Sequence, residues 1–508
     1  MLIFNPLLVK CLKNVSDSDI IFRYKKEGEF HMKAKRIIAL VLSVLALFAF
    51  AGCKEEKKDK NNEDLVGFDD TDYTKDLEVA DYDGYKFRIL IRPGKTPDQY
   101  LEEDSDDPVE SAVYKRNKTV EGMYNIEIVA TESSNTDGET DALNSILAGD
   151  DAYDVIFPHT GSAFTYAVQG ACVNYNDVST IHTEKPWWSQ DIIDSFDVNG
   201  NLYILDGDIS MHRLEYAMCM YFNKTIFDEL GLDYPYEMVE YGEWTFDEFE
   251  ELTKQGGADL NGDGIITPED DQFGYVSNEW QTPISIIYTG GQRIYTKNEE
   301  GIPELTLNSL KTVDIYDSFF GLFDNEACFL QLTTEQHKNY KGPHIFTAGR
   351  AMFHDGNLGE AKSFRSMEDD FGILPLPKYE YDEEYATIVN GHAHVMIMPI
   401  TVEDTEKTGA IIEALCAIGS RDVLPAFYDV SLKTKFARDN ESEDMMDIIR
   451  ESIIYDLGYC SGGTFQSIGR NLAISGNYDF ASVYAASESA ALMRLRDFNE
   501  SYGGIEAE

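Results

Sequence analysis

Short apolar runs alternate with amphipathic stretches in the first part of the chain. The run at 86–91 predicts a strand, and residues 108–123 place apolar side chains at helical spacing. The alternation continues with a strand at 124–129, a helix at 140–147 and a strand at 153–157. Strands that alternate with helices in this order predict a parallel sheet in an α/β domain.

The rest of the chain has the same mixed pattern. Further strands are expected at 201–205, 217–222, 273–276, 351–353, 371–374 and 395–398, and helices at 223–230, 245–254, 403–418 and over much of 443–508. The clearest helix start is at Thr245, because Glu248 follows three residues later and the two form a capping box.

A secretory signal lies near the N-terminus. A short cationic segment begins at Met32, and residues 37–50 are apolar apart from Ser43. This run is shorter than the roughly 20 residues of a membrane span, and small residues follow it, as in a signal peptide. Cys53 follows Ala and Gly and resembles the acylated cysteine of a lipobox, although Phe50 replaces the usual Leu. We predict cleavage before Cys53 and lipidation of Cys53; the alternative is an ordinary signal peptide with a coincidental cysteine.

Residues 1–31 do not fit this arrangement, because a signal peptide should begin the chain. Codons for residues 26–32 can contain a ribosome-binding sequence just before the Met32 codon. We therefore expect residues 1–31 to be a mis-annotated extension and 32–52 to be the signal peptide. Residues 53–80 are polar and charged, which predicts a flexible tether.

The chain after the signal is strongly acidic. Residues 1–52 hold eight Lys/Arg and four Asp/Glu, so the remainder carries 34 basic and 88 acidic residues, a net charge of −54. Such a chain repels nucleic acid and anionic surfaces, and it disfavours a strongly anionic solute unless a local basic pocket overrides the charge. Five cysteines remain besides Cys53, mostly in apolar surroundings, and we expect buried free thiols rather than disulfides. They are Cys172, Cys219, Cys328, Cys416 and Cys460.

Several short sequence motifs occur along the chain in the same order as in a known protein family. They are Leu147-Ala148-Gly149-Asp150 with Tyr153-Asp154-Val155-Ile156, then Met220-Tyr221-Phe222-Asn223-Lys224, Trp244-Thr245-Phe246-Asp247-Glu248, Phe346-Thr347-Ala348-Gly349-Arg350-Ala351-Met352 and Phe371-Gly372-Ile373-Leu374-Pro375-Leu376-Pro377. Together they resemble extracellular solute-binding proteins of family 1, the receptors of ABC importers. The resemblance implies an α/β, two-lobed, periplasmic-binding-protein-like fold of type II with a hinge. Lobe one would comprise 81–212 and 396–445, and lobe two 213–395 and 446–508.

The resemblance also implies a monomeric receptor, lipid-anchored on the outer face of the cell membrane, that delivers a small solute to ABC permease subunits. Aromatic residues make up 12 % of the chain, which favours a sugar or oligosaccharide, because aromatic faces pack on pyranose rings while polar groups bind hydroxyls. Peptides and other solutes remain alternatives. The candidate ligand-binding residues are Trp280, Trp188, Thr160, Asp355, Asp208 and Glu215. A core or surface role for the tryptophans, and a solvated loop for the acids, is the alternative in each case.

A calcium-loop pattern lies between two predicted elements. Oxygen-bearing residues alternate around Gly264 as in an EF-hand loop, in which the glycine permits a sharp turn. The last position holds Asp instead of the usual Glu. We predict a single structural Ca²⁺ loop, with a charged turn as the alternative. Its ligands would be Asp259, Asn261, Asp263, Ile265 through its carbonyl, and Asp270.

Enzyme motifs are not evident in the sequence. It contains no G-x-S-x-G or H-E-x-x-H motif and no phosphate-binding glycine loop. His392 and His394 are close enough to share a strand face and bind a metal, but no third ligand is evident and a hinge strand is the favoured interpretation. We therefore expect a binding protein that is not an enzyme. A secreted surface glycoside hydrolase or a non-transport surface sensor is the alternative.

Overall fold

The computed structural model describes residues 73–95, 98–133, 136–332, 342–391, 393–428 and 440–505. The predicted signal peptide, Cys53 and the tether up to residue 72 lie outside these residues. The tether was predicted to extend to residue 80, but η2 (Tyr73–Asp76) contacts α14 (Thr405–Ile418). The stretch 73–80 therefore belongs to the folded part of the chain.

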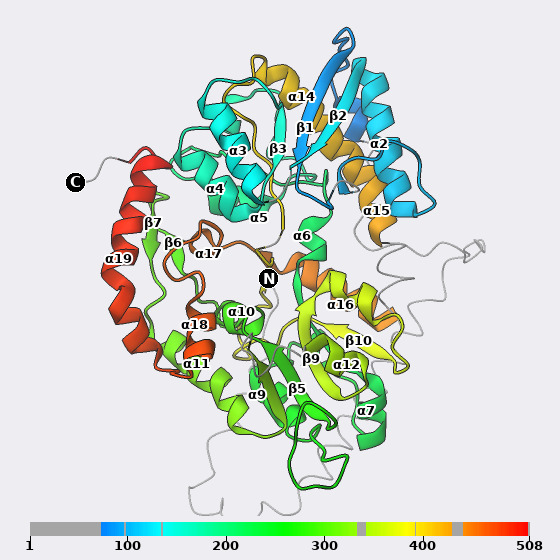
Figure 1. Cartoon of the computed structure of the whole chain (residues 1–508), viewed down its shortest axis with the longest axis vertical. Coiled ribbons are helices and arrows are strands. Elements are labelled where there is room, and N and C mark those ends of the chain that lie inside the picture. The colour runs from blue at the N-terminus through cyan, green and yellow to red at the C-terminus, as the bar shows by residue number, and fades with distance from the viewer. Residues whose placement is uncertain are drawn as a thin grey trace, which may run out of the picture. The chain divides into compact units, whose positions relative to one another are not determined.

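Lobe one is built on a parallel sheet with the strand order β2-β1-β3 (Figure 1). Its strands are β1 (Tyr85–Ile91), β2 (Ile126–Glu132) and β3 (Val155–Phe157), and its helices include α2 (Pro108–Tyr124), α3 (Thr136–Leu147), α4 (Thr160–Val168) and α5 (Gln190–Phe196). The predicted strand–helix order is confirmed. Asp107 is the N-cap of helix α2, and its carboxylate accepts hydrogen bonds from the backbone amides of Val109 and Glu110. Pro108 costs no hydrogen bond at the first helical position, because the amide there has no partner within the helix.

Lobe two is built on a mixed sheet with the order β10-β4-β9-β5-β8. The strands are β4 (Met218–Asn223), β5 (Phe273–Asn278), β8 (Cys328–Gln331), β9 (Ala351–Asn357) and β10 (Phe371–Leu374), and the helices include α7 (Lys224–Leu230), α8 (Tyr236–Glu240), α9 (Phe246–Thr253), α10 (Thr282–Thr289), α11 (Leu310–Gly321), α12 (Gly342–Thr347) and α13 (Ala361–Phe364). Thr245 caps α9 by accepting the Glu248 amide, as predicted. Strand β5 is parallel to β9 and β8, so their carboxyl ends lie at one edge of the sheet.

Three neighbouring crossings join the lobes. The first crossing runs through α6 (His212–Glu215) into β4. Its residue Ala217 forms an antiparallel bridge with Val389, which lies in the second crossing. The second crossing pairs with the third through β11 (Thr387–Ile388) and β12 (Ile453–Ile454). The predicted strands at 201–205 and 395–398 form single bridges rather than strands, Leu205 to Met396 and Ile156 to Ile397. The Ala217–Val389 bridge and the β11–β12 pair hold the three crossings side by side as one hinge.

The C-terminal part covers both lobes. It comprises α16 (Asn440–Glu451), α17 (Leu457–Cys460), α18 (Ile468–Ser475) and α19 (Phe480–Ser501). Helix α16 packs on β10 and α8 of lobe two, although the sequence placed residues up to 445 in lobe one. Helix α19 begins on lobe two, where Phe480 stacks on Tyr316, and ends on lobe one, where the Tyr502 hydroxyl donates to the Phe196 carbonyl at 2.9 Å. Helix α19 and the residue after it therefore contact both lobes.

The five cysteines of the folded part are buried free thiols, as predicted: Cys172, Cys219, Cys328, Cys416 and Cys460.

Candidate functional site

A cavity of about 310 Å³ opens between the lobes beside the first crossing. Lobe two contributes Lys362 and Arg365, which follow β9. The other walls come from the loop after β1, the start of α2, α6 and the segment after α14. They are Asp98, Asp107, Val109, Glu110, Val113, Met211, Glu215, Val423 and Phe427. The cavity thus joins apolar walls to charged groups, as small-molecule sites commonly do.

A buried arginine holds the loop after β1 against the first crossing. Arg116 on α2 donates to the carbonyl oxygens of Ile209 at 2.7 Å and Gln99 at 2.9 Å. Burial lowers the pKa of Arg116 to about 10, which still leaves it charged at neutral pH. The Gln99 amide also donates to Ser210 Oγ at 3.2 Å. Asp98, the neighbour of Gln99, is therefore fixed against α6.

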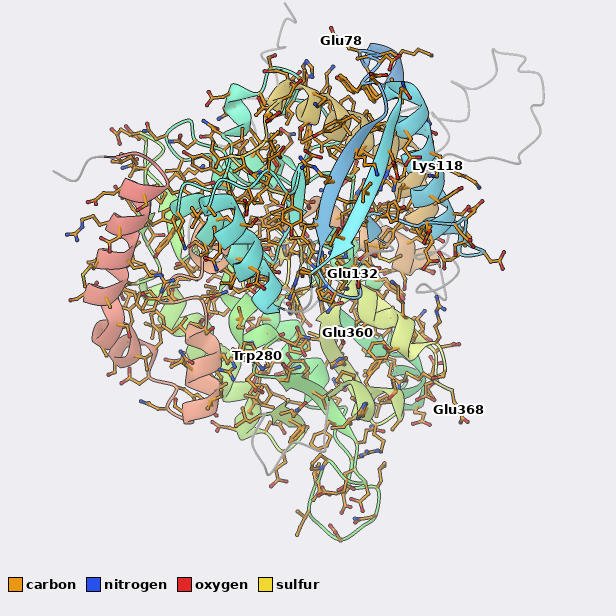
Figure 2. The ribbon with its side chains drawn as sticks, turned by 45° about the horizontal axis from the view of Figure 1, so that its top comes forward. Glu78, Lys118, Glu132, Trp280, Glu360 and Glu368 are labelled. Atoms are coloured by element: carbon orange, nitrogen blue, oxygen red, sulfur yellow. The ribbon has the colours of Figure 1, made fainter. Side chains whose placement is uncertain are left out.

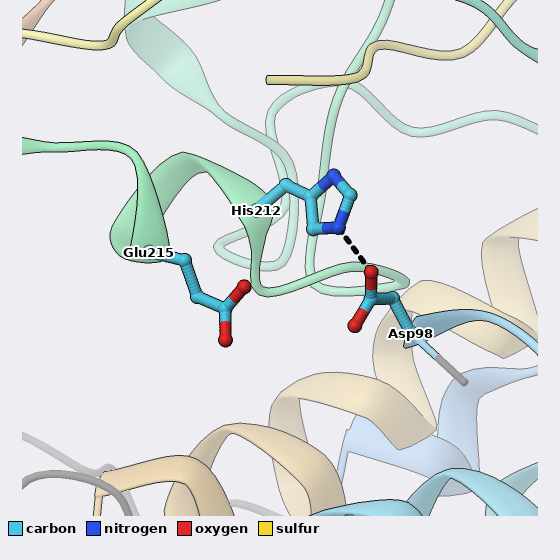
Figure 3. Close-up of side chains that lie close together, drawn as sticks. All are labelled: Asp98, His212 and Glu215. Atoms are coloured by element: carbon cyan, nitrogen blue, oxygen red, sulfur yellow. Dashed lines mark hydrogen bonds and ion pairs between the residues drawn. The ribbon is translucent and has the colours of Figure 1, made fainter. Parts of the chain in front are cut away.

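Three potential ligand side chains meet at this wall of the cavity (Figure 3). One ligand atom each of Asp98, His212 and Glu215 lies within 4.8 Å of the others. His212 is fully buried, and its Nε2 is in direct contact with an Asp98 carboxylate oxygen. Glu215 contacts the Lys362 ammonium group at 2.5 Å. Of the predicted ligand-binding acids, Glu215 is the one that lines this cavity.

Trp280 follows β5 and is 49 % exposed, so its indole ring is accessible (Figure 2). Its amide donates to Asn278 Oδ1 at 2.9 Å, which fixes the backbone just beyond the strand. The guanidinium carbon of Arg470 lies 3.8 Å from the ring centroid, a cation–π contact that covers one face of the ring. The remaining exposure leaves aromatic surface that a solute could contact.

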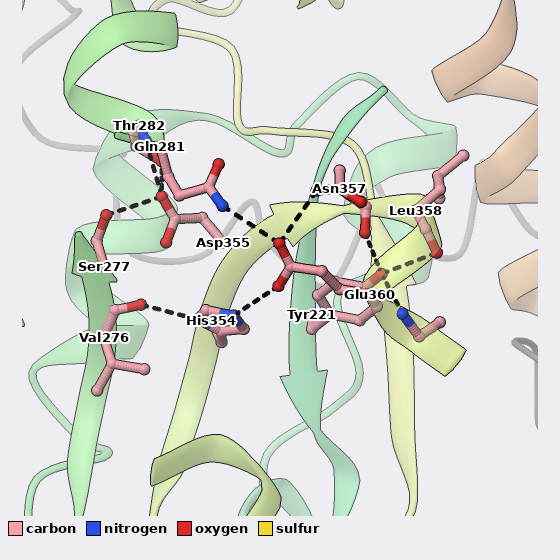
Figure 4. Close-up of polar contacts among 11 residues, drawn as sticks. Tyr221, Val276, Ser277, Gln281, Thr282, His354, Asp355, Asn357, Leu358 and Glu360 are labelled. Carbon is pink, nitrogen blue, oxygen red and sulfur yellow. Dashed lines mark hydrogen bonds and ion pairs between the residues drawn. The ribbon is translucent and has the colours of Figure 1, made fainter. Parts of the chain in front are cut away.

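One glutamate just after β9 holds three polar side chains (Figure 4). Glu360 accepts from the Gln281 side-chain amide at 3.2 Å and from the Asn357 amide at 3.1 Å. His354 Nε2 contacts the second oxygen of Glu360 at 3.4 Å. Burial alone would lower the pKa of His354, but the Glu360 carboxylate outweighs that effect and the pKa is raised. Gln281, Glu360 and Arg470 were not predicted from the sequence. The one local signal for any of them was that Gln281 follows Trp280 just after a predicted strand.

Two of the predicted ligand-binding residues are core residues instead. Trp188 is 1 % exposed and donates its indole N–H to Glu413 at 2.9 Å, so it offers no face to a solute and the prediction is wrong. Asp355 is completely buried beneath α10 and accepts from Ser277 Oγ at 2.8 Å and from the Thr282 amide at 2.9 Å. Burial raises the pKa of Asp355. Its carboxylate caps the start of α10 and does not line the cavity.

The two remaining predicted residues are buried at the hinge. Thr160 starts α4 and donates its hydroxyl to the Ala393 carbonyl at 3.0 Å. Asp208 pairs with Arg213 at 3.0 Å. Both side chains are buried, which corrects their prediction as solute contacts. Asp206, which was not predicted from the sequence, lies near the same arginine, and burial raises its pKa to about 7.

The second histidine of the predicted pair lies beside His212. The rings of His212 and His394 are 4.2 Å apart, and burial lowers the pKa of His394 well below its usual range. His392 lies outside the described residues. In the described part of the chain, His394 therefore packs within the hinge.

The loop at 259–270 forms a series of tight turns around its acidic side chains. Asp259 accepts the amides of Gly262 at 2.7 Å and Gly264 at 2.8 Å. Gly264 has a φ of +84°, the conformation that the motif requires of a glycine. The Asn261 amide reaches Asp270 at 3.1 Å, which brings the two ends of the motif together. These oxygen-rich side chains are of the type that hard cations prefer.

Comparisons with known proteins identify the family. The model of the bacterial extracellular solute-binding protein family matches residues 115–417, more than half of the chain. The chain belongs to this family, whose members are binding proteins. A comparison with curated proteins gives no match.

Solved structures share the fold at low sequence identity. A sugar transporter from Rhizobium etli in an open conformation has a TM-score of 0.56 at 12 % identity, covering 83 % of this chain and 100 % of that one. A solute-binding protein from Thermotoga lettingae bound with α-D-tagatose gives 0.51 at 13 %, covering 82 % and 100 %. UgpB from Mycobacterium tuberculosis in complex with glycerophosphocholine gives 0.51 at 15 %, covering 81 % and 98 %. The shared architecture is the two-lobed α/β fold of solute-binding proteins.

Proposed function

We propose that the chain is the lipid-anchored extracellular receptor of an ABC importer and that it binds a carbohydrate between its lobes. The observation that carries the carbohydrate assignment is Trp280, an exposed indole at the carboxyl end of β5. An indole face buries the apolar face of a pyranose. Glu360 accepts the side-chain amide of the next residue, Gln281, and is 23 % exposed, so it would accept a sugar hydroxyl. The tagatose bound to the Thermotoga protein is consistent with this class of solute.

Closure of the lobes is the mechanism that this receptor would use. Three hydrogen-bonded crossings form a narrow hinge, and the cavity at the first crossing has walls from both lobes. A solute that contacts both lobes stabilises the closed state by its differential affinity for that state. Permease subunits would then distinguish the closed, loaded receptor from the open one.

The experiment is a thermal-shift screen with mono- and oligosaccharides, followed by calorimetry on any hit. A sugar at a hundred times its Kd stabilises the folded state by about 2.7 kcal/mol, a rise of a few degrees in Tm. Trp280→Ala should abolish the shift, whereas Tyr241→Ala, which removes another exposed ring, should leave it unchanged. The carbohydrate assignment would be withdrawn if no sugar raised Tm.

Two alternatives predict different behaviour of the same sample. A surface glycoside hydrolase would turn over the oligosaccharide, whereas a receptor returns it intact, and chromatography of the incubated sugar separates these outcomes. A non-transport sensor would bind sugar, yet deletion of its gene would not reduce uptake of the labelled sugar by cells.

The anchor is proposed from the sequence. No helix in the described part of the chain is both long enough and apolar enough to cross a bilayer. Cys53 with two or more acyl chains would hold the receptor stably at the membrane surface. Mass spectrometry of the N-terminal peptide should find a diacylated or triacylated Cys53, and Cys53→Ala should release the protein into the medium. An unmodified Cys53 in the mature protein would refute the anchor.

We also propose that the loop at 259–270 binds Ca²⁺ as a brace between α9 and β5. The donor set fits, because the side chains of Asp259, Asp263 and Asp270 place carboxylates along turns that Gly262 and Gly264 allow. Isothermal titration should show one Ca²⁺ bound, and Asp263→Asn should weaken it. Absence of calcium binding to the wild-type chain would exclude the site.

A further inference from the structure

A histidine and two carboxylates form a cluster that solute binding does not explain. His212 and Glu215 are three residues apart on the single turn of α6 and therefore share a face. Asp98 reaches the same space from the loop after β1, 114 residues away in the sequence, and meets His212 Nε2 (Figure 3). Burial of His212 fixes its ring, since it packs against His394 and Tyr216.

The separation of the three ligand atoms suits a small cation. They lie within 4.8 Å of one another. Ligands at about 2.0–2.2 Å from a tetrahedral Zn²⁺ are about 3.4 Å apart, so shifts of about 1 Å would bring them into the coordination sphere. One imidazole with two carboxylates is a donor set for Zn²⁺ and neighbouring first-row metals, whereas Ca²⁺ requires six to eight oxygens.

The cluster also leaves one side open. Asp98 and Glu215 line the cavity of about 310 Å³, while His212 lies buried behind them. An ion held by three protein ligands at this wall would direct its fourth position into the cavity. Three protein ligands with one open position is the arrangement of zinc sites that bind water or an exogenous oxygen.

Positively charged side chains lie beside the carboxylates of the cluster. Glu215 binds Lys362 through Oε1, and Lys95 lies nearby with its ammonium group 2.9 Å from the Tyr216 hydroxyl. Arg365 lines the cavity as well, as do the acids Asp107 and Glu110. Lys362 therefore competes with an incoming cation for Glu215, although a carboxylate has a second oxygen. Removal of the Lys362 ammonium group should therefore strengthen the binding of a cation by Glu215.

We propose that Asp98, His212 and Glu215 bind a divalent transition-metal ion of the Zn²⁺ type at the first crossing. The ion would separate Asp98 from His212 and tie the loop after β1 to the hinge helix. The proposal does not depend on the sugar assignment, because metal binding is measured without a solute.

The test uses the chain without an affinity tag, stripped with a chelator and kept in saturating Ca²⁺ to occupy the oxygen-rich loop at 259–270. Co²⁺ should produce visible absorption bands of a low-symmetry site, and Zn²⁺ should displace it with a stoichiometry of one. Asp98→Asn and Glu215→Gln should each weaken Zn²⁺ binding at least about tenfold, since even losing a partner of a ligand costs about 10- to 100-fold.

Two control variants give the opposite or no effect. Lys362→Gln removes the competing ammonium group and should tighten Zn²⁺ binding. Glu110→Gln removes a carboxylate from the same cavity but not from the cluster, and should leave binding unchanged. His212→Gln should also abolish the Co²⁺ bands, but this residue is buried and its variant could fail to fold, so the partly exposed Asp98 and Glu215 decide the question. No Co²⁺ bands, or equal Zn²⁺ affinity in Asp98→Asn and wild type, would overturn the proposal.

Discussion

Asp206 provides a direct test of how a buried carboxylate makes the stability of the folded chain depend on pH. Its carboxylate is buried, and Oδ2 has no hydrogen-bond partner in the described structure. Asp208 is nearby and also depends on Arg213 for charge compensation. Burial raises the pKa of Asp206 from 3.8 to about 7, an effect that Arg213 reduces but does not cancel. The folded chain therefore holds a proton here at pH values where the unfolded chain has lost it.

The sign of the pH effect follows from this difference. Between pH 4 and pH 7 the folded state binds the proton and the unfolded state does not, so stability falls as the pH rises. The slope for one proton is about 1.4 kcal/mol per pH unit, and the loss reaches up to about 4 kcal/mol once the pH exceeds about 7. Above that pH both states are ionised and the contribution stays constant.

Asp206→Asn removes the titration and keeps the shape of the side chain. The variant should resemble wild type in stability near pH 4 and exceed it by up to about 4 kcal/mol at pH 8. Urea unfolding at several pH values, monitored by tryptophan fluorescence, measures this difference. Asp233→Asn, an exposed acid on the surface of lobe two, should change nothing. If Asp206→Asn retained the wild-type slope between pH 5 and pH 7, the burial argument would be refuted.

Three further substitutions test the packing of the lobes. Trp188→Phe leaves the Glu413 carboxylate without its indole donor, and chemical denaturation should show a loss of about 1–3 kcal/mol; an unchanged midpoint would mean that water replaces the bond. Gly274→Ala places a Cβ 1.8 Å from the Thr253 carbonyl oxygen, so lobe two should fail to fold, and a native circular dichroism spectrum would contradict this. Thr245→Ala removes the cap of α9 and should cost about 0.5–2 kcal/mol, whereas Thr245→Ser should retain most of it, as differential scanning calorimetry can check.

Much of the fold was predictable because its signals are local. The apolar run of β1 and the Thr245 cap of α9 involve neighbours in the sequence, and both lie within a residue or two of the prediction. The strands expected at 201–205 and 395–398 were harder, because these segments form isolated bridges, Leu205 to Met396 and Ile397 to Ile156, instead of a ladder. Apolar patterning shows that a segment is buried, but it does not show how many hydrogen bonds the segment makes.

The candidate site was less predictable, because burial depends on distant partners. Trp188 is satisfied by Glu413, 225 residues later, and no local pattern distinguishes such a core tryptophan from an exposed one. Trp280 acquires Arg470 from a helix near the C-terminus. His212 likewise meets Asp98, 114 residues earlier, in a loop whose next residue, Gln99, is held by Arg116. Residue type suggested the chemistry, and tertiary contacts decided which residues can perform it.

The long helix α19 restricts how the lobes can separate. Its 22 residues span about 33 Å, from a contact with Tyr316 at one end to contacts with Phe196 and Phe164 at the other. In Figure 1 it lies along one edge of the two lobes, whereas α2 and α15 (Leu424–Ala426) lie toward the opposite edge. A motion that keeps both ends of α19 in place is a rotation about an axis near that helix. Together with the three crossings, α19 ties the lobes to each other at two places, and an opening that keeps both ties is a rotation that leaves both of them near its axis.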